Sequence, residues 1–115
     1  MSHNPNTLKL VLTDHWFEEI KSGRKTHEYR QVKPYWISKI YGCSKETAKY
    51  IDLKRDGFIM LKGNEKIEFQ KAYRKNAEKM LFSVKSLSIH NGKDTDLKID
   101  DFVFDFELGE RIDVN

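Results

Sequence analysis

The segment from Ile20 to Arg30 limits most strongly what this chain can fold into. A short amphipathic pattern ends at Gly23 and leads into a strand pattern that has no apolar face. Side chains alternate along a strand, so its two sides carry Thr26, Glu28 and Arg30 on one and Lys25, His27 and Tyr29 on the other. A strand in a small domain normally gives one face to the core. Two polar faces therefore predict that one of them lines a wet cleft.

Two other arrangements fit the same residues. The segment can be a solvated edge strand with a local pair between Glu28 and Arg30, or the two side chains can be buried as a structural couple. In a cleft, the Arg30 guanidinium offers a fork of donors that suits a phosphate or a carbonyl. The Glu28 carboxylate can accept a hydrogen bond from an exocyclic amine of a base.

Length and composition predict a single domain. The 115 residues suffice for one core, and no apolar run approaches the roughly 18 residues of a membrane span. Residues 1–6 are polar and predict a disordered tail rather than a signal peptide. Cys43 is the single cysteine, which excludes an internal disulfide and fits a cytoplasmic protein.

The charge is unevenly distributed along the chain. The net charge is +6 over residues 21–50, +5 over residues 51–93 and −6 over residues 94–115, against +3 for the whole chain. A basic body can present a positive face to an anionic partner. Alternatively, the acidic segment packs back on the basic one and neutralises it.

Apolar alternation predicts strands over residues 7–13, 58–61, 66–71, 81–89 and 101–108, in addition to the polar strand. The apolar residues of 81–89 change parity, so a bend or bulge is expected near Ser86. Helical stripes predict a helix capped by Thr13 or Asp14, a second from Pro34 to Gly42, and a short third piece capped by Ser44. Five or six mostly antiparallel strands with two or three short helices predict an α+β fold, most simply a small β-barrel.

Most familiar catalytic and metal-binding patterns are missing from the sequence. It has no glycine loop for phosphate, no cysteine pair and no Gly-x-Ser-x-Gly turn. The four histidines are scattered without metal-ligand spacing: His3, His15, His27 and His90. We therefore expect no metal and no cofactor, and His27 has the best claim among the histidines to a functional site.

Candidate nucleic-acid contacts lie in two segments of the sequence, residues 29–36 and residues 71–75. Tyr29, Tyr35 and Trp36 are aromatic surfaces on which a base can stack, although Trp36 also fits core packing on its helix. A later basic loop fits either a contact to a nucleic-acid backbone or an ordinary solvated hairpin; it contains Lys71, Tyr73, Arg74 and Lys75.

The order Gly23-x-Lys25-x-x-Glu28-x-Arg30 resembles the ASCH domain, a member of the PUA-like superfamily, in its small bacterial and phage form. Trp16 and Ile20 before it and Lys33-Pro34-Tyr35-Trp36 after it belong to the same likeness. Residues 8–36 carry the resemblance, and residues 66–109 carry it more loosely. Residues 42–64 do not match and read as an insertion in a single domain that spans residues 7–115.

The resemblance implies a PUA-like β-barrel with a cleft beside the polar strand and a role in binding RNA or handling modified nucleobases. The implied ligand site contains Gly23, Lys25, Thr26, Glu28, Arg30, Lys33, Tyr35 and Trp36. Phosphate contacts would come from the basic loop and from Lys33. The sequence thus predicts an RNA- or nucleobase-binding module.

Two alternatives remain. Some small members of the family are amidohydrolases that remove the acetyl group from N4-acetylcytidine with a lysine and a threonine. Lys25 matches that lysine, but Glu28 stands where the threonine is expected, so the Glu28 carboxylate would have to activate water. The third possibility is a protein-interaction domain that uses the acidic tail.

Overall fold

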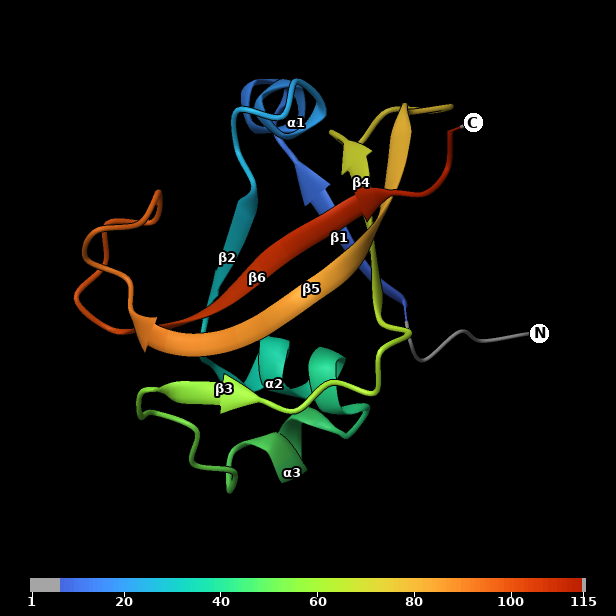
Figure 1. Ribbon diagram of the computed structural model, residues 1–115. Helices are drawn as coiled ribbons and strands as arrows, with labels where there is room; N and C mark the ends of the chain where they lie inside the picture. Colours follow the sequence, from blue (N-terminus) through green and yellow to red (C-terminus); the bar gives the residue numbers. More distant parts are fainter. Residues whose placement is uncertain (1–6, 115) are drawn as a thin grey trace. The chain divides into compact units, whose positions relative to one another are not determined.

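The computed structural model describes residues 7–114, so the predicted tail at residues 1–6 lies outside the described residues. Six strands and three short helices follow one another in these residues (Figure 1). Their order is β1 (Thr7–Leu12), α1 (Asp14–Lys21), β2 (His27–Gln31), α2 (Pro34–Tyr41), α3 (Lys45–Ala48), β3 (Gly57–Ile59), β4 (Lys66–Lys71), β5 (Lys79–Asn91) and β6 (Phe102–Arg111). The strands pair in both parallel and antiparallel fashion, which confirms the predicted α+β class.

The chain divides into two compact units. The first contains the residues up to His27, Leu61–Lys85 and the chain from Glu107 onward, and the second contains Glu28–Met60 and Ser86–Phe106. Both boundaries in the later part of the chain fall inside strands, so β5 and β6 each contribute to both units. The predicted insertion at residues 42–64 belongs to the second unit as far as Met60.

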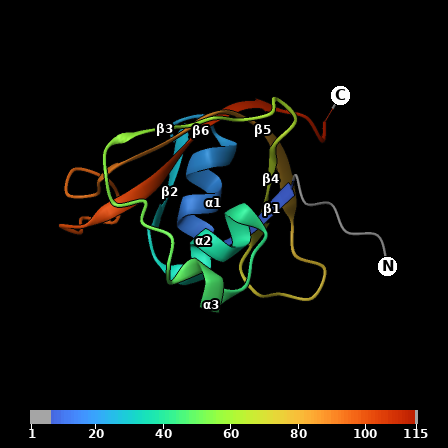
Figure 2. The ribbon, with the colours of Figure 1, turned by 90° about the horizontal axis from the view of Figure 1, so that it is seen from below.

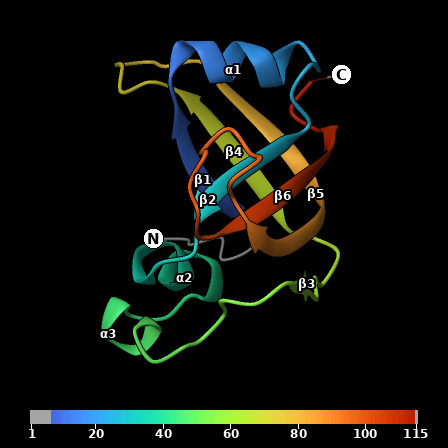
Figure 3. The same cartoon turned by 90° about the vertical axis from the view of Figure 1, so that its left-hand side faces the viewer.

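The first unit is built on β1 and β4. These strands are parallel, with Leu10 opposite Phe69, and β4 pairs antiparallel with β5, with Phe69 opposite Met80. Helix α1 lies across β1 and β4 (Figures 1 and 3). The apolar core of this unit consists of Leu10, Leu12, Phe17, Ile20, Ile67, Phe69, Met80, Phe82 and Leu108. The core residues of β1 and β4 alternate as the sequence predicts.

Helix α1 begins where the sequence predicts, but its cap differs. Thr13 is the N-cap residue, yet its side chain accepts no hydrogen bond from the first turn. The helix starts instead with the bond from the Phe17 backbone N–H to the Thr13 carbonyl, at 2.9 Å. The predicted side-chain cap is therefore wrong, and the other candidate, Asp14, is engaged by Arg74 at 2.6 Å. Gly23 follows the helix with φ of 84°, the left-handed conformation that favours glycine.

The second unit contains β2, β3, α2, α3 and the adjoining halves of β5 and β6. The strand order within it is β3-β5-β6-β2, so β2 is an edge strand. Helices α2 and α3 lie side by side (Figures 2 and 3). The core of this unit consists of Val32, Ile37, Ala48, Leu87, Ile89, Val103, Phe104 and Phe106.

The helix boundaries of the second unit follow the local sequence signals. Pro34 occupies the first turn of α2, and Gly42 ends the helix with φ of 68°. Ser44 caps α3, since its hydroxyl accepts the Thr47 backbone N–H at 3.1 Å. The predicted parity change in β5 is also confirmed, because Met80 and Phe82 are buried before it and Leu87 and Ile89 after it.

Candidate functional site

The polar strand β2 holds a buried carboxylate bound by its neighbouring arginine. Glu28 is only 4% exposed. The Arg30 Nη1 donates to Glu28 Oε2 at 2.5 Å and to the Tyr29 carbonyl at 3.0 Å. The Arg30 side chain is 16% exposed, so it lies between the core and the surface. Of the three arrangements that the sequence allows, the structure has the buried pair, on an edge strand.

Helix α2 adds aromatic rings to this pair. The Arg30 Cζ lies 5.2 Å from the centroid of the Trp36 ring, which is a cation–π contact. The Tyr35 and Trp36 rings meet edge to face at 4.8 Å, and the Lys39 Nζ lies 5.5 Å from the Tyr35 ring. We call Glu28, Arg30, Tyr35, Trp36 and Lys39 the β2–α2 cluster. Lys39 is not among the residues predicted from the sequence, although its i,i+4 spacing from Tyr35 on a helix is the signal that places both on one face.

Arg30 uses only part of its hydrogen-bonding capacity within this cluster. A guanidinium has five N–H donors, and both hydrogen bonds of Arg30 use Nη1. Among the described residues, no acceptor engages its Nε or Nη2. The pair thus holds Arg30 in one orientation while donors remain for an external anion or carbonyl.

Three residues of the predicted site belong to the first unit: Gly23, Lys25 and Thr26. The Lys25 Nζ lies 4.9 Å from the Trp16 ring, and the Lys25 backbone N–H donates to the Glu19 carbonyl at 3.0 Å. Thr26 is exposed, and its carbonyl accepts from the Leu108 backbone. Lys25 therefore belongs to the same unit as α1, whereas Glu28 and Arg30 belong to the same unit as α2.

Two other predicted contacts around β2 differ in accessibility. Lys33 is the exposed N-cap residue of α2. Tyr29 is half-buried against His90, with 6.3 Å between the ring centroids, and this burial raises the pKa of Tyr29. Tyr29 is thus less open to stacking than Tyr35, which is 43% exposed.

The basic loop after β4 is partly neutralised by helix α1. The Lys71 Nζ lies 2.6 Å from Glu18 Oε2, and Arg74 Nη2 lies 2.6 Å from Asp14 Oδ2. The hydrogen bond from Arg74 lowers the pKa of Asp14, and the bond to Glu18 raises the pKa of Lys71. Tyr73 is 89% exposed, and Lys75 is exposed as well. Two of the four predicted backbone contacts therefore already hold carboxylates.

The acidic end of the chain also neutralises basic residues of its own unit. Lys54 bonds both carboxylate oxygens of Asp101 at 3.1 Å. Asp101 also accepts from the Phe102 backbone at 2.7 Å and from Gln31 at 3.1 Å. These bonds, that of the backbone above all, lower the pKa of Asp101. This part of the acidic segment packs back on the basic one, as one of the two alternatives predicts.

His90 lies between two acceptors that favour its charged form. Its Nδ1 lies 2.9 Å from the Asn91 carbonyl and its Nε2 lies 2.8 Å from Asp105 Oδ2. Both partners are acceptors, so the protonated ring can donate from both of its nitrogens. The bond to Asp105 raises the pKa of His90.

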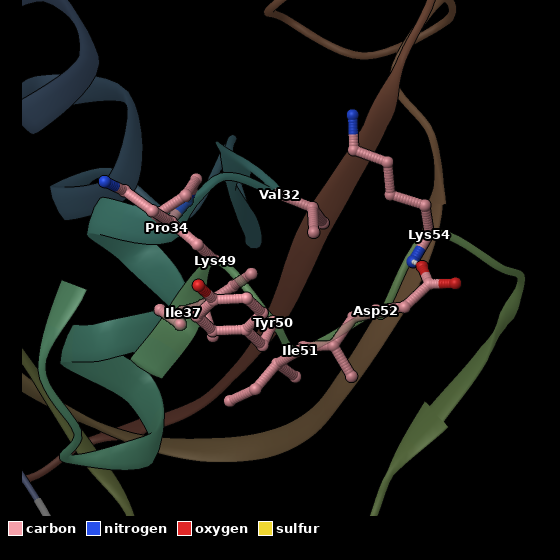
Figure 4. Close-up of a pocket in the computed structure, with 10 residues that line it drawn as sticks. Val32, Pro34, Ile37, Lys49, Tyr50, Ile51, Asp52 and Lys54 are labelled. Atoms are coloured by element: carbon pink, nitrogen blue, oxygen red, sulfur yellow. Dashed lines mark hydrogen bonds between the residues drawn. The ribbon is translucent and has the colours of Figure 1, made fainter. Parts of the chain in front are cut away.

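A hollow of about 320 Å³ lies beside α2 and α3 (Figure 4). Its apolar lining includes the buried Val32, Ile37 and Ala48. Its polar lining is Lys49, Asp52 and Lys54, and Tyr50 is also part of the wall. This hollow could not be predicted from the sequence, because residues 42–64 carry no recognisable motif and the wall forms only when α2 and α3 pack together.

Within residues 7–114, no group of three or more His, Cys, Asp or Glu side chains is placed to hold a metal ion. No helix in the described part of the chain is long and apolar enough to cross a membrane. Cys43 is a half-buried free thiol.

Comparison with known proteins gives no relative. No family model matches the chain, and neither a curated protein nor a solved structure matches it.

Proposed function

We propose that this chain is an RNA- or nucleobase-binding module of the ASCH type, with a PUA-like fold and with Arg30 as its main ligand-binding residue. The observation that carries the proposal is the fixed guanidinium of Arg30, held by the buried Glu28 and in cation–π contact with Trp36. A guanidinium fixed in this way loses little conformational freedom when it binds a phosphate or a base carbonyl.

The neighbouring side chains suit the same ligand. Tyr35 is exposed beside Trp36 and offers a ring face on which a base can stack. Lys33 is exposed at the start of α2, and Lys39 lies over the Tyr35 ring. One anionic group at Arg30, one base at Tyr35 and a second phosphate at Lys33 or Lys39 make a consistent set of contacts for one or two nucleotides.

The role of Glu28 in this proposal is to position Arg30. A carboxylate that is 4% exposed and bound by its own neighbour is poorly placed to meet a base directly. The same burial argues against Glu28 as a base that activates water. Binding is therefore better supported than the amidohydrolase alternative.

The experiment is a fluorescence anisotropy titration of labelled single-stranded RNA at about 50 and 200 mM salt. Arg30→Gln removes the cation and keeps a polar partner for Glu28. We expect it to weaken binding about tenfold or more. Arg24→Gln is the matched control, since Arg24 is an exposed arginine of the first unit that pairs with Glu19.

The salt dependence tests the contacts with phosphate. Each lost contact with a single strand should reduce the slope of log affinity against log salt by about 0.7. Equal affinities of the Arg30→Gln protein and the wild type would remove Arg30 from the site. Absence of binding by the wild type at low salt would overturn the proposed function.

A further inference from the structure

Two large aromatic side chains of the second unit are almost fully exposed. Tyr50 is 90% exposed and Phe58 is 82% exposed. Tyr50 follows α3, and Phe58 is the central residue of β3, where it lies opposite Ser88 of β5. Aromatic side chains of this size normally contribute to a core, so their exposure on one short segment points to a partner.

Basic residues alternate with these rings along the chain. Lys49 precedes Tyr50, and Lys54 and Arg55 lie between Tyr50 and Phe58. All three cations are exposed, and neither Lys49 nor Arg55 forms an ion pair with a described residue. We call residues 49–60 the aromatic–basic segment.

The segment forms the walls of two hollows within its own unit. The first, of about 320 Å³, is lined by Lys49, Tyr50 and Lys54 (Figure 4). The second, of about 260 Å³, is lined by Arg55 and Phe58. Leu53 lines both hollows. Each hollow thus combines apolar lining, an exposed ring, at least one cation and one aspartate, which is Asp52 in the first and Asp56 in the second.

We infer that the aromatic–basic segment is a track for single-stranded nucleic acid, in which Tyr50 and Phe58 stack bases and Lys49 and Arg55 contact phosphates. Aromatic rings and cations in alternation are the arrangement by which single strands are bound without base readout. A duplex does not offer its base faces to such rings, because they are already stacked. The inference rests on the proposed function and extends it to a second surface that the resemblance leaves unmatched.

The two cations of the segment that form no ion pair within residues 7–114, Lys49 and Arg55, favour a polyanion over a second protein chain. Residues 49–60 hold three basic and two acidic side chains, and one of the basic residues, Lys54, is paired with Asp101. Strand β3 has only three residues, which is short for an edge that recruits another strand. An apolar partner would leave the cations around Tyr50 and Phe58 without counter-charge.

The test compares the wild type with the double variant Tyr50→Leu/Phe58→Leu. Leucine keeps an apolar side chain and removes the aromatic face, and the exposed positions should leave the urea midpoint unchanged. The probes are a labelled oligouridine RNA, an oligodeoxyuridine strand of the same length and an RNA hairpin, and the binding of each is followed by fluorescence anisotropy. Ile112→Ala is the control, because Ile112 is an exposed apolar residue of the first unit.

We expect the wild type to bind the single strands more tightly than the hairpin, and the double variant to lose about tenfold or more. One stacked base is worth about fivefold to a hundredfold in affinity. Ile112→Ala should stay within about twofold of the wild type, since it removes no stacking surface. Tighter binding of the RNA strand than of the DNA strand would show that the ligand is RNA. Equal binding would show that the track accepts any single-stranded nucleic acid.

The outcomes separate this inference from the proposed function. Binding that Arg30→Gln weakens and the double variant does not would overturn the inference and leave the proposed function standing. Binding that only the double variant weakens would support the inference and remove Arg30 from the site. A double variant that binds normally but no longer self-associates in sedimentation would overturn the track in favour of a second copy of the chain.

Discussion

The Arg30 guanidinium lies 2.5 Å from the carboxylate of Glu28, two residues earlier on the same edge strand. Spacing by two residues puts both side chains on one face of β2, and the carboxylate of this pair is buried. A buried carboxylate without its partner would be an uncompensated charge, so the pair couples the fold of the second unit to the orientation of Arg30.

We predict that Glu28→Ala lowers the free energy of unfolding by about 3 kcal/mol, because it leaves the half-buried Arg30 without its counter-charge. Urea denaturation measures the change. Glu19→Ala removes the partner of the exposed Arg24 and should have a much smaller effect. Equal effects of the two substitutions would contradict the structural role of Glu28.

We predict that the bond between His90 and Asp105 makes stability depend on pH. The pKa of His90 is raised in the folded state. The stabilisation is therefore fully present below the unfolded pKa of histidine and is lost as the pH rises through the folded pKa. Asp105→Asn should flatten this loss in thermal melts from about pH 6 to 8. An NMR titration in which the His90 ring of the wild type titrates no higher than in Asp105→Asn would count against this prediction.

We predict that Gly92→Ala is destabilising by about 1–3 kcal/mol. A Cβ at position 92 would lie 2.5 Å from Val103 Cγ1 and 3.1 Å from Ile99 Cγ1. Val103 is completely buried, so the neighbouring side chains have little room to move. Chemical denaturation measures the effect. An unchanged midpoint would show that the turn after β5 is packed less tightly than described.

We predict that Ser44→Ala lowers the free energy of unfolding by about 1 kcal/mol, because α3 loses the acceptor for the Thr47 backbone N–H. Ser44→Asp keeps an acceptor at that position and is the matched control, with stability close to that of the wild type. Helix α3 leads directly into the hollow lined by Lys49 and Tyr50, so Ser44→Ala should also weaken nucleic-acid binding. A loss of the same size in both variants would exclude capping as its cause.

Local patterns in the sequence are enough to predict most of the elements. Gly42 ends α2 and Ser44 caps α3 because these effects depend on neighbouring residues only. The parity change of β5 is likewise visible in the order of its apolar residues, from Phe82 to Leu87. The side-chain cap at Thr13 was the exception, since the bond it would make is absent in the described helix.

The candidate site could be predicted only in part, because its state depends on contacts distant in sequence. Lys71 and Glu18 are 53 residues apart, and Arg74 and Asp14 are 60 apart. No local pattern shows that these cations are already paired. The burial of Glu28 has the same origin, since strand pairing and packing decide it. The exposure of Phe58 could not be predicted either, because a short apolar run in the sequence is equally typical of a buried strand.

The most direct test of the proposed site uses the fluorescence of Trp36. The chain has two tryptophans, so Trp16→Phe leaves Trp36 as the sole tryptophan, whose emission is excited selectively above the absorption of tyrosine. We predict that single-stranded RNA quenches this emission with the same dissociation constant that anisotropy gives, and that Arg30→Gln weakens both signals together. RNA binding that leaves the Trp36 emission unchanged would contradict a ligand site at Arg30 and Trp36.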